Sequence, residues 1–173
     1  MNGNNMIVIE TPRLNIRKYT EEDTAALFAI LSDPITMAFW PAPFSSRQTE
    51  EWIERNIQSY ITQGFGRWAV ELKDTGRLIG DAGIMKSELN GSVENDLGYI
   101  IHSNYWRQGY AYEAAKSILS YALQELGLAR ICINMPADHA ASEGVAIKLG
   151  LNKETEYRNR RNRDILTCLY STF

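Results

Sequence analysis

The residues best suited to chemistry lie between Trp106 and Tyr112, where an arginine and a glycine directly precede a helix-like apolar pattern. The first backbone N–H groups of a helix have no partner inside it, and the helix dipole adds about half a positive charge there. Gly109 lets the backbone approach a ligand closely, and Arg107 can bind phosphate oxygens. This segment therefore predicts an anion site suited to a pyrophosphate. A connection that merely needs a glycine explains the same residues, so the loop alone decides nothing.

The elements that position this loop alternate between strands and helices. A strand is predicted over Asp96–His102 and a helix over Tyr110–Leu126, whose apolar residues recur every three or four positions. Another strand, Arg130–Met135, and a short helix, Ala140–Leu149, follow. Upstream, similar patterns predict a strand at Arg13–Lys18, helices from Thr20 and from Ser45 or Ser46, strands at Trp68–Leu72 and Leu78–Met85, and a hairpin turn at Asn90-Gly91. The order predicts one α/β (α+β) domain over residues 1–173 with a mostly buried sheet.

Composition limits the function classes. The 173 residues carry a formal net charge of −3, which gives no support to nucleic-acid binding. No apolar run approaches the roughly 20 residues that span a bilayer, and no basic segment precedes the first apolar run, so we expect a cytoplasmic protein without a membrane partner. Cys132 and Cys168 stand alone in apolar runs and are expected to be buried thiols. His102 and His139 lack ligand spacing, so no metal is expected.

A resemblance makes the loop specific. The segment Trp106-Arg-Gln-Gly-Tyr-Ala111 resembles the acetyl-CoA loop of the GNAT N-acetyltransferase superfamily, in which two small residues follow a Gln or Arg. An aromatic residue at its first position and the following Glu113-Ala114 resemble the RimJ/RimL-type branch. Further elements that resemble this branch, in the same order, are Thr11-Pro12-Arg13-Leu14, His139-Ala-Ala-Ser142, Lys148-Leu-Gly-Leu151 and the closing strand with Asp164 and Leu169-Tyr170.

The resemblance implies a mixed, twisted sheet of about six to seven strands with helices on both faces, and a cleft where two central strands separate. Acetyl-CoA would be the acetyl-donor cosubstrate. The resemblance places its pantetheine arm beside the strand end and the helix loop, with His139 standing where relatives have an asparagine. The expected cofactor-binding residues are Ile100, Ile101, His102, Arg107, Gln108, Gly109, Tyr110, Ala111, Tyr112, His139 and Ser142.

The resemblance also suggests catalytic residues. Relatives often carry a tyrosine acid where this chain has Ala146, and Ser142 takes that role here by resemblance; it is equally plausible as a helix-cap serine. Asp96 aligns with an acidic residue of many relatives and is nominated as the base, acting directly or through water, with Glu94 as a second candidate. A surface carboxylate explains Asp96 equally well. The aromatic, proline-rich segment around Trp40 and Phe44 is either a packed loop or a wall of the substrate site.

These observations predict an N-acetyltransferase that moves an acetyl group from acetyl-CoA to a primary amine by direct attack in a ternary complex. The amine is a protein N-terminus or a small molecule, and a homodimer is one expected assembly because relatives often form dimers. The alternative is a non-catalytic acyl-CoA-binding or sensing module on the same fold. The absent tyrosine and the His139 substitution motivate that alternative.

Overall fold

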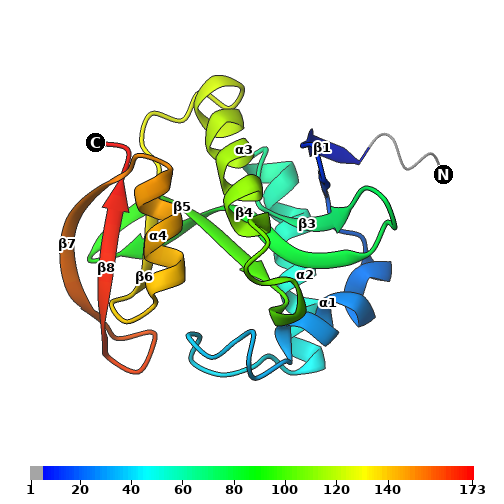
Figure 1. Ribbon diagram of the computed structural model, residues 1–173, viewed down its shortest axis with the longest axis horizontal. Helices are drawn as coiled ribbons and strands as arrows, with labels where there is room; N and C mark the ends of the chain where they lie inside the picture. The colour runs from blue at the N-terminus through cyan, green and yellow to red at the C-terminus, as the bar shows by residue number, and fades with distance from the viewer. Residues whose placement is uncertain (1–5) are drawn as a thin grey trace.

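The computed structural model describes residues 6–173 and forms one eight-stranded mixed sheet with helices on both faces (Figure 1). Five strands run antiparallel in chain order, and the last three form the other part of the sheet in the order β6-β8-β7. Their bounds are β1 (Ile7–Glu10), β2 (Leu14–Arg17), β3 (Arg67–Leu72), β4 (Leu78–Leu89), β5 (Ser92–Ile101), β6 (Cys132–Pro136), β7 (Asn152–Asn159) and β8 (Ile165–Ser171).

Four α-helices cover the sheet: α1 (Thr24–Leu31), α2 (Ser46–Thr62), α3 (Tyr110–Gln124) and α4 (Ala140–Lys148). The apolar residues of α3 and α4 bury one core against one face of the sheet, around Ile118 and Ala146. The helices α1 and α2 bury a second core on the opposite face, around Leu27 and Trp52. Each face of the central strands is therefore covered, which explains their long runs of buried residues.

Local sequence signals explain where most elements begin. Ser45 caps α2, because its hydroxyl accepts from the Gln48 amide while Gln48 Oε1 accepts from the Ser45 amide. Asn90 and Gly91 both have positive φ, as a tight hairpin turn requires, and they join β4 to β5 as predicted. Cys132 and Cys168 are buried free thiols, which confirms their predicted environment.

Two features differ from the sequence prediction. The sheet has eight strands rather than six to seven, because Ile7–Glu10 pairs with β2 and extends the edge. The helix predicted to begin at Thr20 starts instead as a separate 3₁₀ turn at Glu21–Asp23, and α1 follows it. The Asp23 carboxylate holds this turn, since it accepts from the Thr20 amide and pairs with Arg17.

The sheet is nearly divided between β5 and β6. These two strands are parallel, and within residues 6–173 they share a single paired position, Asp96 with Cys132. Beyond Asp96, β5 continues to Ile101 and β6 to Pro136 without pairing to each other. The helix α3 forms the crossover between them, so its N-terminus lies at the end of β5, beside the gap.

Candidate active site

The gap opens into a cavity of about 850 Å³ that reaches both faces of the sheet. One end is lined by the loop before α3, and the other by side chains from the α1–α2 connection, β3, β4 and the β7–β8 turn. Successive residues of β5 point to opposite faces of the sheet, so Asp96, Gly98 and Ile100 share one face while Leu97, Tyr99 and Ile101 share the other. The cavity is therefore lined by residues from both faces of β5, with Asp96 on one face and Tyr99 on the other.

The loop before α3 has an unusual backbone. Arg107 and Gly109 both adopt left-handed conformations, with φ of 62° and 81°. The first intrahelical bond runs from the Glu113 amide to the Gly109 carbonyl, so the amides of residues 110–112 come before it. A Cβ added to Gly109 would lie 3.5 Å from the Arg13 guanidinium, with no other described residue within 4 Å apart from its own neighbours in the chain. The loop is therefore open to a ligand, and its free amides beside Arg107 are the features that an anion site requires.

A clamp from the start of the chain holds this loop. The Glu113 carboxylate accepts from the Thr11 hydroxyl at 2.6 Å, the Arg13 amide at 3.0 Å and Arg13 Nε at 2.8 Å. Arg13 also lies over the Tyr110 ring, 4.1 Å from its centre. Burial favours the neutral form of Glu113, but these bonds outweigh it and lower the pKa of the carboxyl. The two motifs near residues 11–14 and 113–114 thus form one structural unit that fixes the helix N-terminus.

Trp106 attaches the same loop to the strand end. Its indole Nε1 donates to the Ile101 carbonyl at 2.7 Å, where β5 no longer pairs with β6. His102 lies at the start of the short turn that follows, and its Nδ1 accepts from the Asn104 amide. Lys148 lies over the Tyr112 ring, 3.9 Å from its centre, beside the first turn of α3.

Asp96 lies in the cavity wall, on the face of β5 opposite to that of Tyr99 and Ile101. Its Oδ1 accepts from Asn134 Nδ2 at 3.1 Å, the one hydrogen bond that its side chain makes to the described residues. Burial raises the pKa of the carboxyl to about 6, although Arg67 and the Asn134 bond oppose the change. A carboxyl with this pKa is ionised at neutral pH and basic enough to accept a proton. Glu94 instead pairs with Arg130 at 3.0 Å and is absent from the described cavity wall.

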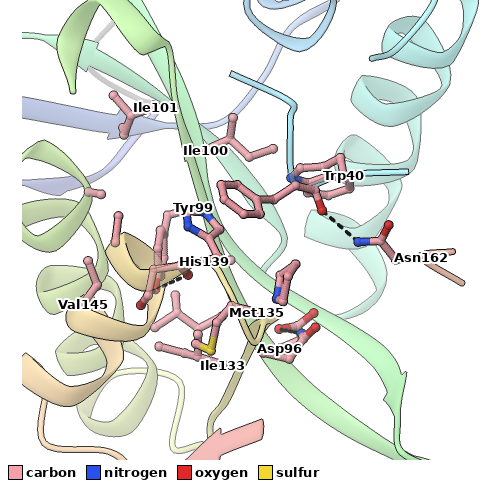
Figure 2. A pocket seen from close by; sticks show the side chains of 18 of the residues that line it. Trp40, Asp96, Tyr99, Ile100, Ile101, Ile133, Met135, His139, Val145 and Asn162 are labelled. Atoms are coloured by element: carbon pink, nitrogen blue, oxygen red, sulfur yellow. Dashed lines mark hydrogen bonds between the residues drawn. The ribbon is translucent and has the colours of Figure 1, made fainter. Parts of the chain in front are cut away.

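Ser142 meets a tyrosine that sequence reasoning did not identify. Tyr99 Oη donates to the Ser142 carbonyl at 3.0 Å and lies 3.1 Å from its Oγ (Figure 2). Burial raises the pKa of Tyr99 to about 12, so the phenol stays protonated. The Ser142 side chain makes no capping bond to α4 in the described structure. The pair places two hydroxyl groups on the face of β5 nearer α4.

A buried ion pair lies behind the Asp96 side of the cavity. Arg67 Nε donates to Asp81 Oδ1 at 2.6 Å, and both side chains are almost fully buried. The other Asp81 oxygen accepts from the Tyr19 hydroxyl at 2.5 Å and from Trp52 Nε1 at 2.8 Å. Since the carboxylate has three donors, this network holds Arg67 firmly on the cavity wall.

The α1–α2 connection crosses the mouth of the cavity. The Phe39 ring stacks on His139, with centroids 3.8 Å apart and planes 7° from parallel. The Phe39 carbonyl accepts from Asn162 Nδ2 at 2.8 Å (Figure 2). Trp40 follows Phe39 and lines the cavity, whereas Phe44 packs edge-on against Trp40 behind it. This segment closes the cavity from one side.

Most of the predicted site residues come together in this cavity. Its wall includes Asp96, Ser142, Ile100, Ile101, Arg107, Gly109, Tyr110, Ala111, Tyr112, His139 and Trp40, but not His102, Gln108 or Phe44. Sequence reasoning missed Tyr99, Asn134 and Arg67. Alternation along β5 could have separated Tyr99 from Asp96, and an arginine directly before a buried strand core is itself a signal.

Two kinds of feature are absent from the part of the chain that the structure describes. Within residues 6–173, no three His, Cys, Asp or Glu side chains come close enough to hold a metal ion. No helix in this part of the chain is both long and apolar enough to cross a membrane.

Comparisons with known proteins all indicate the same family. Residues 13–152 match the family described as the acetyltransferase (GNAT) domain. The uncharacterized N-acetyltransferase YoaA of Bacillus subtilis is 32% identical over 149 residues, which cover 85% of this chain and 84% of YoaA. A GNAT-family acetyltransferase from Bacillus anthracis superposes with a TM-score of 0.81 at 24% identity, over 95% and 97% of the two chains. RimL, a ribosomal-protein α-N-acetyltransferase in complex with coenzyme A, superposes with a TM-score of 0.79 at 15% identity, over 96% and 97%.

Proposed function

Because this chain belongs to the GNAT acetyltransferase family, whose enzymes use acetyl-CoA, we propose that it transfers the acetyl group directly to a primary amine bound on the Asp96 side of the sheet. The observation that carries the proposal is the continuous cavity. It joins an anion site at the loop before α3 to a carboxyl of raised pKa through the gap between β5 and β6.

Each substrate has a chemically suitable end of the cavity. The amides of residues 110–112, with Arg107 and Arg13 nearby, suit the pyrophosphate of acetyl-CoA. The gap between the strands leaves room for the extended arm that carries the thioester. The amine acceptor would enter from the opposite face, where Asp96 and Trp40 line the wall.

The transfer balances without a further reactant. The amine nitrogen forms a bond to the acetyl carbon as the carbon–sulfur bond breaks, and the amine gives up a proton. We assign Asp96 as the base that receives this proton, directly or through water. The departing thiolate needs little acid help near pH 7, because a thiol pKa lies near ~8.5. We assign the two hydroxyl groups of the Tyr99–Ser142 pair to donate a hydrogen bond to the departing sulfur.

The experiment has two steps. Thermal unfolding with and without acetyl-CoA tests the donor end, since a ligand at about 100 times its Kd adds about 2.7 kcal/mol of stability. Thiol release from acetyl-CoA is then measured with a panel of peptide N-termini, amino acids and polyamines. A thermal shift together with amine-dependent thiol release supports the proposal. Binding of acetyl-CoA without thiol release in the presence of any amine of the panel would contradict the proposal and favour an acyl-CoA-binding module.

A further inference from the structure

The Arg67 guanidinium has more hydrogen-bonding capacity than its surroundings use. Arg67 is only 4% exposed, and its one side-chain bond to the described residues goes from Nε to Asp81. Nη2 is completely covered and has no partner in this part of the chain, and Nη1 also makes no bond there. A buried N–H group without a partner is costly, so an arginine kept in this state needs an explanation.

The Asp81 network does not supply that explanation. Asp81 already accepts from Tyr19 and Trp52, so one contact with Nε is enough to neutralise it. A lysine at position 67, with a single cationic contact, would neutralise the same carboxylate. The terminal half of the guanidinium is therefore surplus to the ion pair.

That half of the guanidinium occupies the position of a missing side chain on β5. A Cβ added to Gly98 would lie 1.6 Å from Arg67 Nη1 and 2.7 Å from Cζ. Only a glycine at position 98 leaves this space free. Arg67 and Gly98 both line the cavity, so the guanidinium lies against the part of β5 that has left its partner strand.

Asp96 lies two residues before Gly98 and on the same face of the strand, roughly 6.6 Å along the chain. Within the described structure the Asp96 carboxylate makes no ion pair with Arg67, and its contact is to Asn134 instead. The acceptor end thus presents an acid and a cation side by side, each with unused capacity. A small molecule that carries both an amine and an anion would complement both groups.

We propose that Arg67 Nη1, which has no partner among the described residues and, unlike Nη2, is not completely covered, binds a carboxylate of the acceptor, so that the substrate is a small molecule with a carboxylate beside its primary amine, such as an α-amino acid. Arginine is the side chain best suited to a carboxylate, because its donors are charged and held in a plane. The nearby Trp40, Trp52 and Met85 form an apolar wall for the rest of the molecule. This inference rests on the proposed acetyl transfer and names its substrate class.

The inference is tested first on the unaltered protein. A panel of amino acids is compared with the matching primary amides as acetyl acceptors. We expect the best acid to have a kcat/KM at least about tenfold above that of its amide. The amide has the less basic amine, so a larger fraction of it is in the neutral, reactive form at neutral pH, and a preference for the acid must therefore come from binding. Equal or faster transfer to the amides, or to peptide N-termini, would overturn the inference.

Variants then test the role of Arg67. In Arg67→Met the preference for acid over amide is expected to disappear, while the Kd for acetyl-CoA stays unchanged. The double variant Arg67→Met, Asp81→Asn removes the buried carboxylate left behind and serves if the single variant does not fold. Arg161→Met is the matched control, since Arg161 also lines the cavity but is largely exposed. Loss of the preference in this control, or its persistence in both Arg67 variants, would contradict the inference.

A binding measurement separates this inference from the transfer reaction. The same acids and amides are added to the complex with coenzyme A, and thermal unfolding is followed without turnover. Stabilisation by acids that depends on Arg67 supports the carboxylate site even if no amine is acetylated. If amines are acetylated but no acid-selective stabilisation is found, the transfer stands and the carboxylate site is wrong.

Discussion

The two ends of the cavity are built in different ways. The proposed donor end is one stretch of chain, the loop before α3, and its available groups are mainly backbone amides beside a left-handed glycine. The acceptor end is assembled from side chains of at least four separate segments, including Trp40, Arg67 and Asp96. The donor end should therefore be sensitive to the size of a side chain, and the acceptor end to its charge.

The largest effect is expected at the donor end. Gly109→Trp should weaken coenzyme A binding about 100-fold or more, because a Cβ and ring would stand where the phosphates approach. Calorimetric titration measures the Kd. Gly127→Trp is the matched control, since Gly127 also has positive φ and open space around it but lies at the far end of α3. If both variants bind coenzyme A alike, the phosphate-loop assignment is wrong.

At the acceptor end, a change of charge without a change of size should reduce catalysis. Asp96→Asn is expected to lower kcat about 100-fold at pH 7.5, with the Kd for acetyl-CoA unchanged. The base must be deprotonated, so kcat/KM of the unaltered enzyme should fall as the pH drops below about 6. Initial rates measured from pH 5 to 9 should show this acid limb, the fall in kcat/KM below about pH 6, in the unaltered enzyme alone. A limb that persists in Asp96→Asn would assign it to another group.

The same substitution should affect stability in the opposite direction. The folded-state pKa of Asp96 lies above its usual value, so the cost in stability of burying this carboxyl builds as the pH rises from about 4 to about 6 and is complete above that. The free energy of unfolding of Asp96→Asn is therefore expected to exceed that of the unaltered protein by about 2 kcal/mol at pH 8. The difference should vanish below about pH 4, where both side chains are neutral. Urea unfolding at the two pH values checks this, and an equal difference at both would refute it.

A smaller effect is expected where the two ends meet. Tyr99→Phe and Ser142→Ala should each lower kcat about tenfold, because a thiolate leaves without much help near neutral pH. The two losses should not add in the double variant if the hydroxyls act as one pair. Steady-state rates at saturating substrates test this. A normal kcat in Ser142→Ala would dismiss that serine from the chemistry.

The smallest effect concerns the support of the donor loop. Glu113→Gln weakens the clamp with Thr11 and Arg13 and should raise the KM for acetyl-CoA a few-fold, with the KM for the amine unchanged. Glu154→Gln breaks a comparable exposed pair with Arg130, away from the cavity, and is the control. A similar rise in both variants would mean that the clamp has no specific link to the donor.

These differences also explain what could be read from the sequence. The loop Arg107–Tyr112 was predicted because its arginine, glycine and helix start are neighbours in the chain and act through local backbone geometry. The alternation of strands and helices and the caps at Ser45 and Asn90-Gly91 were predictable for the same reason. The extra edge strand was not, because four residues form a strand only when a partner is available.

The acceptor end could not be assembled from sequence because its contacts are long-range. Arg67 and Gly98 are separated by more than thirty positions, and nothing local shows that one fills the space of the other. The Tyr99–Ser142 contact depends on how α4 packs on the sheet after the crossover. Asp96 was identified by resemblance, but its raised pKa follows from burial in the folded protein.

The single pairing between β5 and β6 has a consequence for how the molecule holds together. In residues 6–173 the backbone ladder is almost interrupted at this point, so β1–β5 and β6–β8 are joined chiefly by packing and by α3. Amide protons along the two unpaired edges lack a ladder to slow their exchange with solvent. A donor bound between them, as proposed above, would take the place of a missing strand, so that filling the gap with substrate would also complete the sheet.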